Sequence, residues 1–485
     1  MARGDRDTTG RGHRAPAWWL DAKFGIFVHW TPASVPGFAP VDIDITELFA
    51  TGHPEPLAAS PYTEWYENSL RFPDSPASRH HREHHGDRPY RSFAPDFEAG
   101  LESWDPDAWA RAFRDAGARY VVLVTKHHDG YCLWPSSVPN PNLAGWHTTR
   151  DVVGELAEAV RGVGLRFGVY YSGGLDWTFD DRPLATFSDL IAAAPRGTYL
   201  DYAEAHVEEL VVRYRPEVLW NDISWPTDRR RLRAMLARYY RAVPEGVVND
   251  RWSPRSPLTP LLGSRAVGAA IDAGVRRGAR RGAGIVPPDV GIGDYRTPEY
   301  TVFDTIRPKP WETVRGMDHS FGYNRMSRDE HFIDPDELAR TVVDAASKNG
   351  NLLLNVGPRG EDATIPDPQL ERLAAVGELL GRIGPAVRAT RPWVRPAATS
   401  AEGLPLRFTA RDTAVGVAVL SRPEGEWLTV PDVRVDPGAT ATWSGEGAVE
   451  IEALAGAVRF RVPAGLPDSP VHALVVEGMR ALPVT

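Results

Sequence analysis

Polar residues follow directly after several short apolar runs of this chain. His29 comes after the run that begins at Phe24, and Lys126-His127-His128-Asp129 comes after the run that ends at Thr125. Similar groups are Ser172–Trp177 after Tyr171, Asn221-Asp222 after Trp220, and Asn249–Trp252 after Val248. Reactive groups of parallel α/β barrels gather where the strands end. We therefore expect these His, Tyr, Trp, Arg and carboxylate side chains to converge on one rim.

The residue types on this rim favour sugar chemistry. There is no phosphate-binding glycine loop and no HExxH spacing for zinc. Glycoside hydrolysis needs two carboxyl groups, about 5–5.5 Å apart when configuration is retained and farther apart when it is inverted. Composition and periodicity do not say which carboxyl groups these are. The 16 Trp residues fit sugar stacking, but Trp is also ordinary core material.

Each of these residues also has a purely structural interpretation. His29 could be a hydrogen-bonded core histidine, Asp222 could cap the next helix, and Asn249-Asp250 could form a turn. Arg251 is more informative if it is buried, because a buried guanidinium needs an acceptor. Neighbouring side chains on a strand point to opposite sides, so we expect His127 and His128 to face different surroundings.

Alternating helices and strands must position this rim. Asp105 is a good N-cap and Pro106 suits the first turn of a helix, and the run Tyr120–Thr125 is apolar on both faces, as in a buried parallel strand. The same alternation predicts helices near 151–162, 201–214, 226–242 and 335–348, leading to strands at 165–171, 218–220, 246–248 and 352–354. It indicates a (β/α)8-like (TIM) barrel over residues 15–386.

Three segments depart from this alternation. Residues 1–14 are polar and predict a disordered arm. Residues 254–291 are rich in Arg, Gly, Ala and Pro and predict an insertion loop. Residues 387–485 contain short apolar runs such as Leu406–Thr409, Val415–Leu420 and Val458–Val462 between turn residues, which predicts an antiparallel β-sandwich.

Bulk properties narrow the class of protein. The net charge of -9 favours neither nucleic acid nor an anionic membrane, and the basic run VRRGARRGAG fits a solvated loop better than a nucleic-acid site. The single cysteine, Cys132, excludes an intrachain disulfide. No run of about 18 apolar residues and no apolar signal core is present, so we expect a cytoplasmic protein.

The motifs together resemble the α-L-fucosidases of glycoside hydrolase family twenty-nine. The likeness covers roughly residues 17–385, and its pieces stand in the family's order. They are KFGIFVHWTPASVPGFA (23–39), EWYENS (64–69), KHHDGYCLW (126–134), GVYYSGGLDW (168–177), LWNDISWP (219–226), NDRW (249–252), GDYRTPEY (293–300), SFGYNR (320–325) and NLLLNVGPRGEDATIP (351–366).

The resemblance implies a retaining exo-α-L-fucosidase with no cofactor and no metal. It places the nucleophile at Asp222 and the acid/base at Glu299, with Glu64 as the rival acid. It also implies the residues that hold the sugar: His29, Glu64, Trp65, His127, His128, Tyr170 and Arg251 at the hydroxyls, Phe321 at the C6 methyl, and Trp220 beside the nucleophile.

The implied partner is a fucosylated glycan or glycoside, with no nucleic acid and no membrane, and the sequence leaves a homo-oligomer open. The insertion at 254–291 lies just before Glu299 and is a departure from the family pattern. Two other classes remain as alternatives: a different exo-glycosidase, such as an α-L-galactosidase-like enzyme, and a non-catalytic fucose-binding protein.

Overall fold

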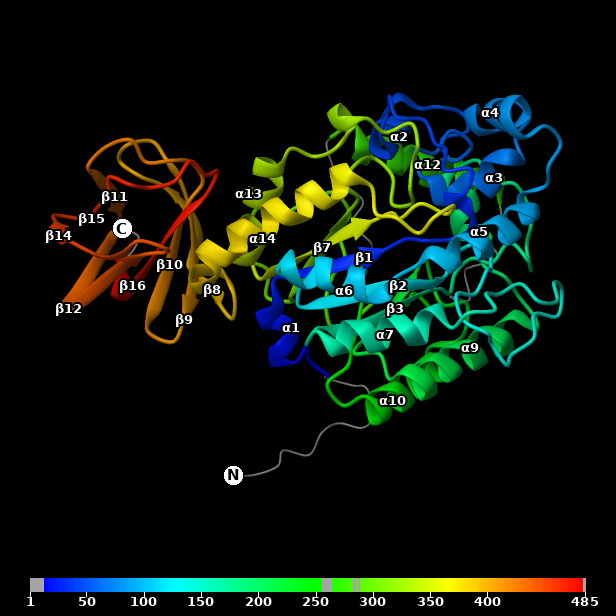
Figure 1. Cartoon of the computed structure of the whole chain (residues 1–485), viewed down its shortest axis with the longest axis horizontal. Helices are drawn as coiled ribbons and strands as arrows, with labels where there is room; N and C mark the ends of the chain where they lie inside the picture. Colours follow the sequence, from blue (N-terminus) through cyan, green and yellow to red (C-terminus); the bar gives the residue numbers. More distant parts are fainter. Residues whose placement is uncertain (1–12, 255–263, 282–285, 287, 483–485) are drawn as a thin grey trace.

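The computed structural model describes residues 13–254, 264–281, 286 and 288–482. A barrel occupies one end of the long axis and a smaller β domain the other, and α14 (Asp367–Val387) runs between them (Figure 1). This confirms the predicted fold class of a TIM-like barrel with a C-terminal sandwich.

The barrel is built on a parallel sheet that has seven strands within the described residues, in the order β5-β4-β3-β2-β1-β7-β6. Every neighbouring pair is parallel. The strands are β1 (Phe24–Val28), β2 (Tyr120–Lys126), β3 (Arg166–Ser172), β4 (Val218–Asp222), β5 (Val247–Val248), β6 (Trp311–Arg315) and β7 (Gly350–Val356). Nearly all their residues are buried, as expected for strands covered on both faces.

The eighth position of the barrel is filled by an irregular segment, residues 293–299, which we call the closing segment. Its Asp294 N–H donates to the Val248 carbonyl of β5 at 2.8 Å. On its other side the Glu312 N–H of β6 donates to the Arg296 carbonyl at 2.8 Å. The chain thus closes between β5 and β6 without a regular strand, which explains why the apolar pattern does not reveal an eighth strand.

The outer helices follow the sequence signals that predicted them. The Asp105 side chain accepts from the Ala108 N–H at the start of α6, and Gly117 follows that helix with φ +83°. The long outer helices are α6 (Pro106–Asp115), α7 (Val152–Gly162), α9 (Tyr199–Tyr214), α10 (Arg229–Ala242), α13 (Pro335–Ser347) and α14. The four helices and the strands predicted near them are confirmed, with ends within a few residues.

Further helices lie at the end of the barrel that is away from the β domain (Figure 1). Those that matter for the site are α2 (Ile45–Thr51), α8 (Phe187–Ala192), the 3₁₀ turn η2 (Thr63–Trp65) and α12 (Arg265–Ala279). The others there are α3 (Tyr66–Leu70), α4 (Pro76–His85) and α5 (Ala94–Gly100), whereas α1 (Ala17–Ala22) lies at the opposite end of the barrel, on the side of the β domain (Figure 1).

Helix α12 corrects the prediction of a loop over residues 254–291. The Ser264 side chain caps it by accepting from the Val267 N–H, and the helix is rich in Ala. Gly268 allows a close approach, because a Cβ there would lie 3.1 Å from the Ser188 hydroxyl. Tertiary contact with α8 therefore outweighs the low helix propensity of its glycines. Residues 255–263, 282–285 and 287 of the predicted loop lie outside the described residues.

The predicted N-terminal arm is also corrected in part. Residues 1–12 lie outside the described residues. His13, however, donates to the Asp294 carboxylate at 2.8 Å and stacks on the Tyr240 ring, with 4.0 Å between the ring centroids. Its imidazole finds a charged acceptor and an aromatic face on the barrel, so this residue is not part of a free arm.

The C-terminal domain is antiparallel throughout the strand pairs that the structure describes, which confirms the predicted sandwich. One sheet has the order β13-β12-β16-β10-β9-β8, and the second is β11-β15-β14. The strands are β8 (Arg391–Thr399), β9 (Pro405–Arg411), β10 (Ala414–Val419), β11 (Trp427–Pro431), β12 (Val433–Trp443), β13 (Gly447–Val449), β14 (Ile451–Leu454), β15 (Ala457–Arg461) and β16 (His472–Ala481).

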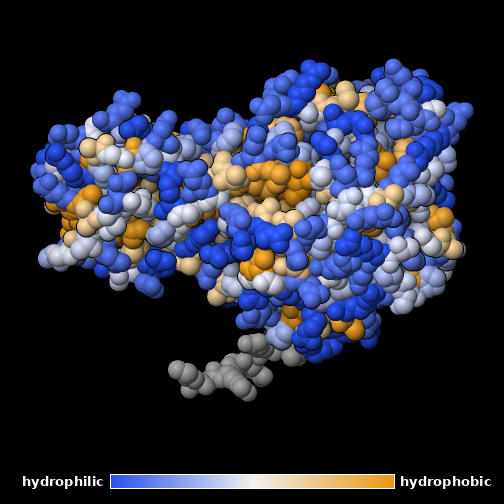
Figure 2. Space-filling model, viewed as in Figure 1, coloured by the Kyte–Doolittle hydropathy of each residue, from blue (hydrophilic) through white to orange (hydrophobic). Residues whose placement is uncertain are grey.

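The surface is largely hydrophilic on the face in Figure 2, with a group of hydrophobic residues near its middle.

No helix among the described residues is long and apolar enough to cross a membrane. Cys132 is buried and unpaired.

Candidate active site

A cavity of about 530 Å³ opens at the carboxyl ends of the barrel strands. All eleven side chains that the family resemblance assigned to the site line it: Asp222, Glu299, His29, Glu64, Trp65, His127, His128, Tyr170, Trp220, Arg251 and Phe321. Other polar residues expected on the rim do not line the cavity, among them Lys126, Asp129, Asn221, Asn249 and Asp250. Each of the eleven lining residues is 9% exposed or less. Residues from eight places in the chain are therefore brought together in one buried pocket.

Asp222 is the last residue of β4 and points into the cavity from the strand end. Its carboxylate accepts from the Tyr170 hydroxyl at 2.8 Å and from the Arg251 guanidinium at 3.0 Å. The Ile223 N–H donates to the same carboxylate at 2.8 Å. Three donors thus fix its orientation.

Glu299 reaches the cavity from the closing segment. Its carboxylate lies 2.5 Å from a terminal nitrogen of Arg251. Burial raises the pKa of Glu299, and the Arg251 charge offsets part of that rise. The segment is held by Asp250, whose carboxylate accepts from both the N–H and the hydroxyl of Thr297, at 3.1 and 2.6 Å.

Arg251 therefore contacts both carboxylates, through different nitrogens of one guanidinium group. The group lies over the Trp220 ring, with 4.7 Å from Cζ to the ring centroid, and donates to the Thr297 carbonyl at 3.2 Å. A planar fork held on several sides has little freedom to move. The buried guanidinium that the sequence marked as informative thus finds its acceptors at the centre of the site.

The backbone directly after each carboxylate is strained. Ile223, after Asp222, has φ +65°, and Tyr300, after Glu299, has φ +50°. A β-branched residue in the left-handed region is an outlier that the surrounding structure must hold in place. At both positions the strained backbone turns the chain immediately beyond the side chain that enters the cavity.

Three histidines supply the polar wall. The Nδ1 atom of His29 lies 2.5 Å from the Asn355 side-chain oxygen, and that of His128 lies 2.7 Å from the Ser172 hydroxyl. Burial lowers the pKa of His29 to about 4 and lowers that of His127 and of His128 well below the usual range. All three imidazoles are therefore neutral near pH 7, each with one donor and one acceptor nitrogen.

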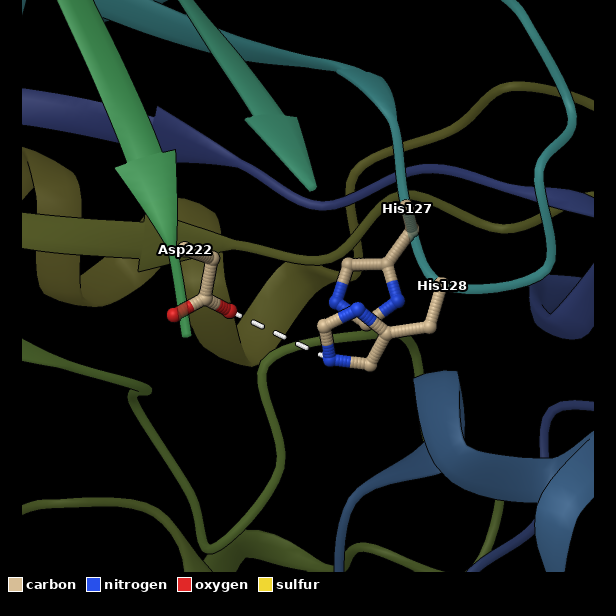
Figure 3. Close-up of side chains that lie close together, drawn as sticks. All are labelled: His127, His128 and Asp222. Carbon is tan, nitrogen blue, oxygen red and sulfur yellow. Dashed lines mark ion pairs between the residues drawn. The ribbon is translucent and has the colours of Figure 1, made fainter. Parts of the chain in front are cut away.

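His127 and His128 lie side by side beyond the end of β2, with 4.0 Å between the ring centroids, and both line the cavity (Figure 3). The expectation that they face different surroundings is wrong. Strand alternation does not apply, because β2 ends at Lys126 and its pairing with β3 is irregular between Val124 and Lys126.

Aromatic rings line the cavity beside these polar groups. Tyr170 is stacked between His127 and Trp220, with ring centroids 5.6 and 5.3 Å away. The ring centroid of Phe321 lies 5.0 Å from that of His29. Trp65 meets His128 edge-on at 5.2 Å. These rings fix the orientation of the polar groups and offer apolar faces to a ligand.

Glu64 lies in η2, on the side of the cavity near Phe321. Its carboxylate accepts from the Gly322 N–H at 2.8 Å. Burial raises the pKa of Glu64 to about 7, which the backbone hydrogen bond only partly offsets. Glu64 is thus a carboxyl group able to hold a proton near neutral pH.

Within the described residues, one group of side chains could hold a metal ion: His127, His128 and Asp222, whose ligand atoms lie within 4.8 Å of one another (Figure 3). The His128 Nε2 atom lies 3.9 Å from the Asp222 carboxylate. Because that imidazole is neutral, the contact is weak. The positively charged Arg251 guanidinium already lies against the Asp222 carboxylate, and it would repel a metal cation bound there. The sequence prediction of no metal and no cofactor stays a prediction.

Sequence reasoning missed several residues that shape the site. Asn355 and Ser172 orient His29 and His128, and both stand in motifs that the sequence showed. Tyr62 lines the cavity two residues before Glu64. Its hydroxyl and the Nδ1 atom of His127 have no hydrogen-bond partner within the described part of the chain. Buried polar atoms of this kind at a cavity wall are suited to a polar ligand.

A barrel rim with two carboxylates on one guanidinium, neutral histidines and aromatic rings defines a glycoside hydrolase. The α-L-fucosidase family model matches residues 5–263 and 272–385. The chain belongs to the α-L-fucosidase family.

Individual relatives agree with this assignment. The tissue α-L-fucosidase of Bos taurus is 31% identical over 441 residues, which cover 88% of this chain and 78% of the relative. Similar solved structures include a Thermotoga maritima α-fucosidase in complex with a mechanism-based inhibitor, at 38% identity and a TM-score of 0.80, covering 98% of this chain and 99% of that one. The same Thermotoga enzyme in complex with fucose gives 38% identity and a TM-score of 0.79, with 96% and 98% covered.

Proposed function

We propose that this protein is a retaining exo-α-L-fucosidase that removes terminal α-L-fucosyl residues from glycans or glycosides. The observation that carries the proposal is the contact of Asp222 and Glu299 with the same Arg251 guanidinium inside one buried cavity. Two carboxyl groups close together suit a double displacement. An enclosed pocket suits a sugar at the end of a chain. We keep a cytoplasmic location as part of the proposal.

In the first step the Asp222 carboxylate attacks the anomeric carbon and forms a covalent bond to it. The bond from that carbon to the leaving oxygen breaks, and Glu299 gives its proton to this oxygen. In the second step Glu299 removes a proton from water, and the water oxygen displaces Asp222. The raised pKa of Glu299 supports its role as the proton donor, because a carboxyl group held by burial keeps its proton at higher pH.

The remaining side chains orient the sugar. Neutral imidazoles can both donate to and accept from ring hydroxyls, so His29, His127 and His128 suit a polyhydroxylated ligand. Phe321 offers an apolar surface for the C6 methyl group. Fucose and galactose differ there by one methyl against one hydroxymethyl group, so discrimination of about 10–200-fold is what such a surface can supply.

Glu64 is the alternative proton donor, because its pKa of about 7 also suits a general acid. We favour Glu299 because it shares Arg251 with Asp222, whereas the Glu64 carboxylate is held by the Gly322 N–H. In either case Asp222 is the nucleophile.

Hydrolysis of an aryl α-L-fucoside tests the proposal, with NMR identifying the first-formed anomer. We expect α-L-fucose first. Appearance of β-L-fucose first would show inversion and overturn the double displacement. Absence of hydrolysis by folded protein would overturn the enzymatic assignment on this substrate class.

Azide rescue assigns the two carboxyl groups by role. In Asp222→Gly, azide should occupy the vacated space and attack an activated aryl fucoside directly, giving the β-fucosyl azide. In Glu299→Ala, the fucosyl-enzyme still forms with a good leaving group, and azide then attacks from the side that water uses, giving the α-fucosyl azide. Wild-type activity of Glu299→Ala on poor leaving groups would transfer the acid role to Glu64, for which Glu64→Ala is the matched test.

A further inference from the structure

The outer half of the cavity differs in chemistry from the inner half. Beyond the carboxylates and histidines, its wall comes from α2, α8 and α12 and from the residue after Asp222. Six half-buried apolar side chains form this part of the lining, which we call the apolar wall: Phe49, Phe187, Leu190, Ile191, Ile223 and Val275. The described polar residues beside them on this part of the wall are Thr46, Ser224 and Ser253.

This apolar wall is held in place by polar contacts on its outside. The Asp272 carboxylate of α12 accepts from the N–H and the hydroxyl of Ser188 in α8, at 2.9 and 2.7 Å. The Arg280 guanidinium donates to the Ala50 carbonyl of α2 at 2.9 Å. Phe49 and Phe187 meet edge-on, with 6.1 Å between the ring centroids. The three helices thus form one built surface.

Such a wall is a poor match for a second sugar ring. Each hydroxyl that leaves water without a partner costs free energy, and the apolar side chains here offer no donor or acceptor. An alkyl or aromatic group, in contrast, gains from contact with them. The position of the wall matters, because Ile223 directly follows Asp222 and lines the same cavity as both carboxylates, so a group attached to the leaving oxygen can contact the wall.

We propose that the leaving-group subsite of this enzyme selects α-L-fucosides whose aglycone is hydrophobic, an alkyl or aromatic alcohol, over fucosyl oligosaccharides. The inference rests on the proposed fucosidase function. The match to the family model is interrupted at residues 264–271, which include the start of α12. The part of α12 that lines the cavity, including Val275, lies beyond this interruption and within the matched residues.

The first test is a series of methyl, butyl and hexyl α-L-fucosides beside α-L-fucosyl-(1→2)-galactose. Simple alcohols and sugar hydroxyls are all poor leaving groups, so the comparison isolates binding in the outer half. We expect kcat/KM to rise by up to about fourfold for each methylene buried, and by more than about tenfold from methyl to hexyl. The disaccharide should stay within a few-fold of the methyl fucoside.

The second test changes the wall. In Val275→Asn we expect the ratio of kcat/KM for hexyl over methyl fucoside to fall by about three- to tenfold, because an amide replaces an apolar contact. Val267→Asn is the matched control: Val267 is half-buried on the same helix but does not line the cavity, and its ratio should equal that of the wild type. Leu190→Asn repeats the test from α8.

The outcomes are distinct. A flat alkyl series, or a disaccharide hydrolysed faster than the hexyl fucoside, would overturn the inference while leaving the fucosidase function in place. An equal fall of the ratio in Val275→Asn and Val267→Asn would also overturn it, since the effect would then be one of helix stability. Failure of the wild type to hydrolyse any fucoside would instead remove the proposed function.

Discussion

At the scale of single residues, Arg251 determines how the two carboxyl groups can behave. It contacts both of them, and at Glu299 its charge lowers the pKa while burial raises that pKa by more. Asp222 has two further donors, Tyr170 and the Ile223 N–H. This asymmetry is what a nucleophile and an acid/base require of otherwise similar groups.

Glu64 gives a test of burial at the same scale. Its folded-state pKa of about 7 lies above its ordinary value of 4.5, so the folded protein binds the proton more tightly than the unfolded chain. The associated stability is fully present below pH 4.5 and is lost as the pH rises through 7. Glutamine does not titrate, so Glu64→Gln lacks this pH-dependent loss of stability. Between pH 4.5 and 8 the free energy of unfolding of the variant should rise, relative to that of the wild type, by on the order of 3 kcal/mol.

Urea unfolding at several pH values measures this difference. Gln keeps an oxygen that can accept from the Gly322 N–H, so the local hydrogen bond is preserved. Glu83→Gln, at an exposed position on α4, is the control and should show no comparable change. A difference between wild type and Glu64→Gln that is independent of pH would show that Glu64 is ionised in the folded protein throughout this range.

At the scale of elements, the closing segment is the part of the barrel on which Glu299 depends. Gly293 begins it with φ +100°, and a Cβ there would lie 2.1 Å from the Asn249 carbonyl oxygen. Gly293→Ala must therefore move backbone beside Asp250, which anchors Thr297. We expect a loss of about 1–3 kcal/mol in stability and a larger loss of kcat on poor than on good leaving groups, because Glu299 is displaced.

Gly291→Ala is the matched control for this prediction. Gly291 also has a positive φ, +67°, but a Cβ there would meet nothing within 4 Å. It carries the conformational cost without the clash. Thermal midpoints and kcat on aryl fucosides of different leaving-group strength decide the matter. An identical effect of both substitutions would mean that the close approach at Gly293 does not position Glu299.

The elements also show what the sequence could and could not predict. Continuous apolar runs such as Tyr120–Thr125 predicted buried strands, because both faces of a parallel sheet are covered. The sequence did not predict strand β6, because Glu312 interrupts its apolar pattern. This buried glutamate accepts hydrogen bonds from the side chains of Tyr120 and Trp220. The sequence did not predict helix α12, because the helix is stabilised by contacts with α2 and α8, and these contacts are not visible in the local pattern of apolar residues.

The same distinction holds for the site. Residues at the strand ends, such as His29 directly after β1 and Asp222 at the end of β4, could be located from the sequence, because strand ends of a barrel share one rim. Glu299 lies in an irregular segment and needed the family resemblance. The outer wall depends on the packing of three helices distant in sequence, and neither periodicity nor motif indicated it.

At the scale of the whole molecule, barrel and sandwich share an apolar interface. Helices α13 and α14 contribute Val343, Leu379 and Ile383, and strands β10 and β16 contribute Ala418 and Ala473, all nearly inaccessible to solvent. Polar contacts surround this cluster, among them the Thr409 hydroxyl with the Ala386 carbonyl and the Arg407 guanidinium with Asp344. An interface packed like a core should make the two domains unfold together.

Two leucines of α14 test this coupling by the same substitution. Leu379 is 3% exposed in the interface, and Leu370 is 37% exposed nearer the start of the helix. Calorimetry of the wild type should show one transition. Leu379→Ala should lower the free energy of unfolding by about 2–5 kcal/mol and move that transition as a whole, because it leaves a cavity between the domains. Leu370→Ala should stay within about 1 kcal/mol of wild type. Two separate transitions in the wild type, or equal effects of the two substitutions, would mean that the shared cluster does not couple the barrel to the sandwich.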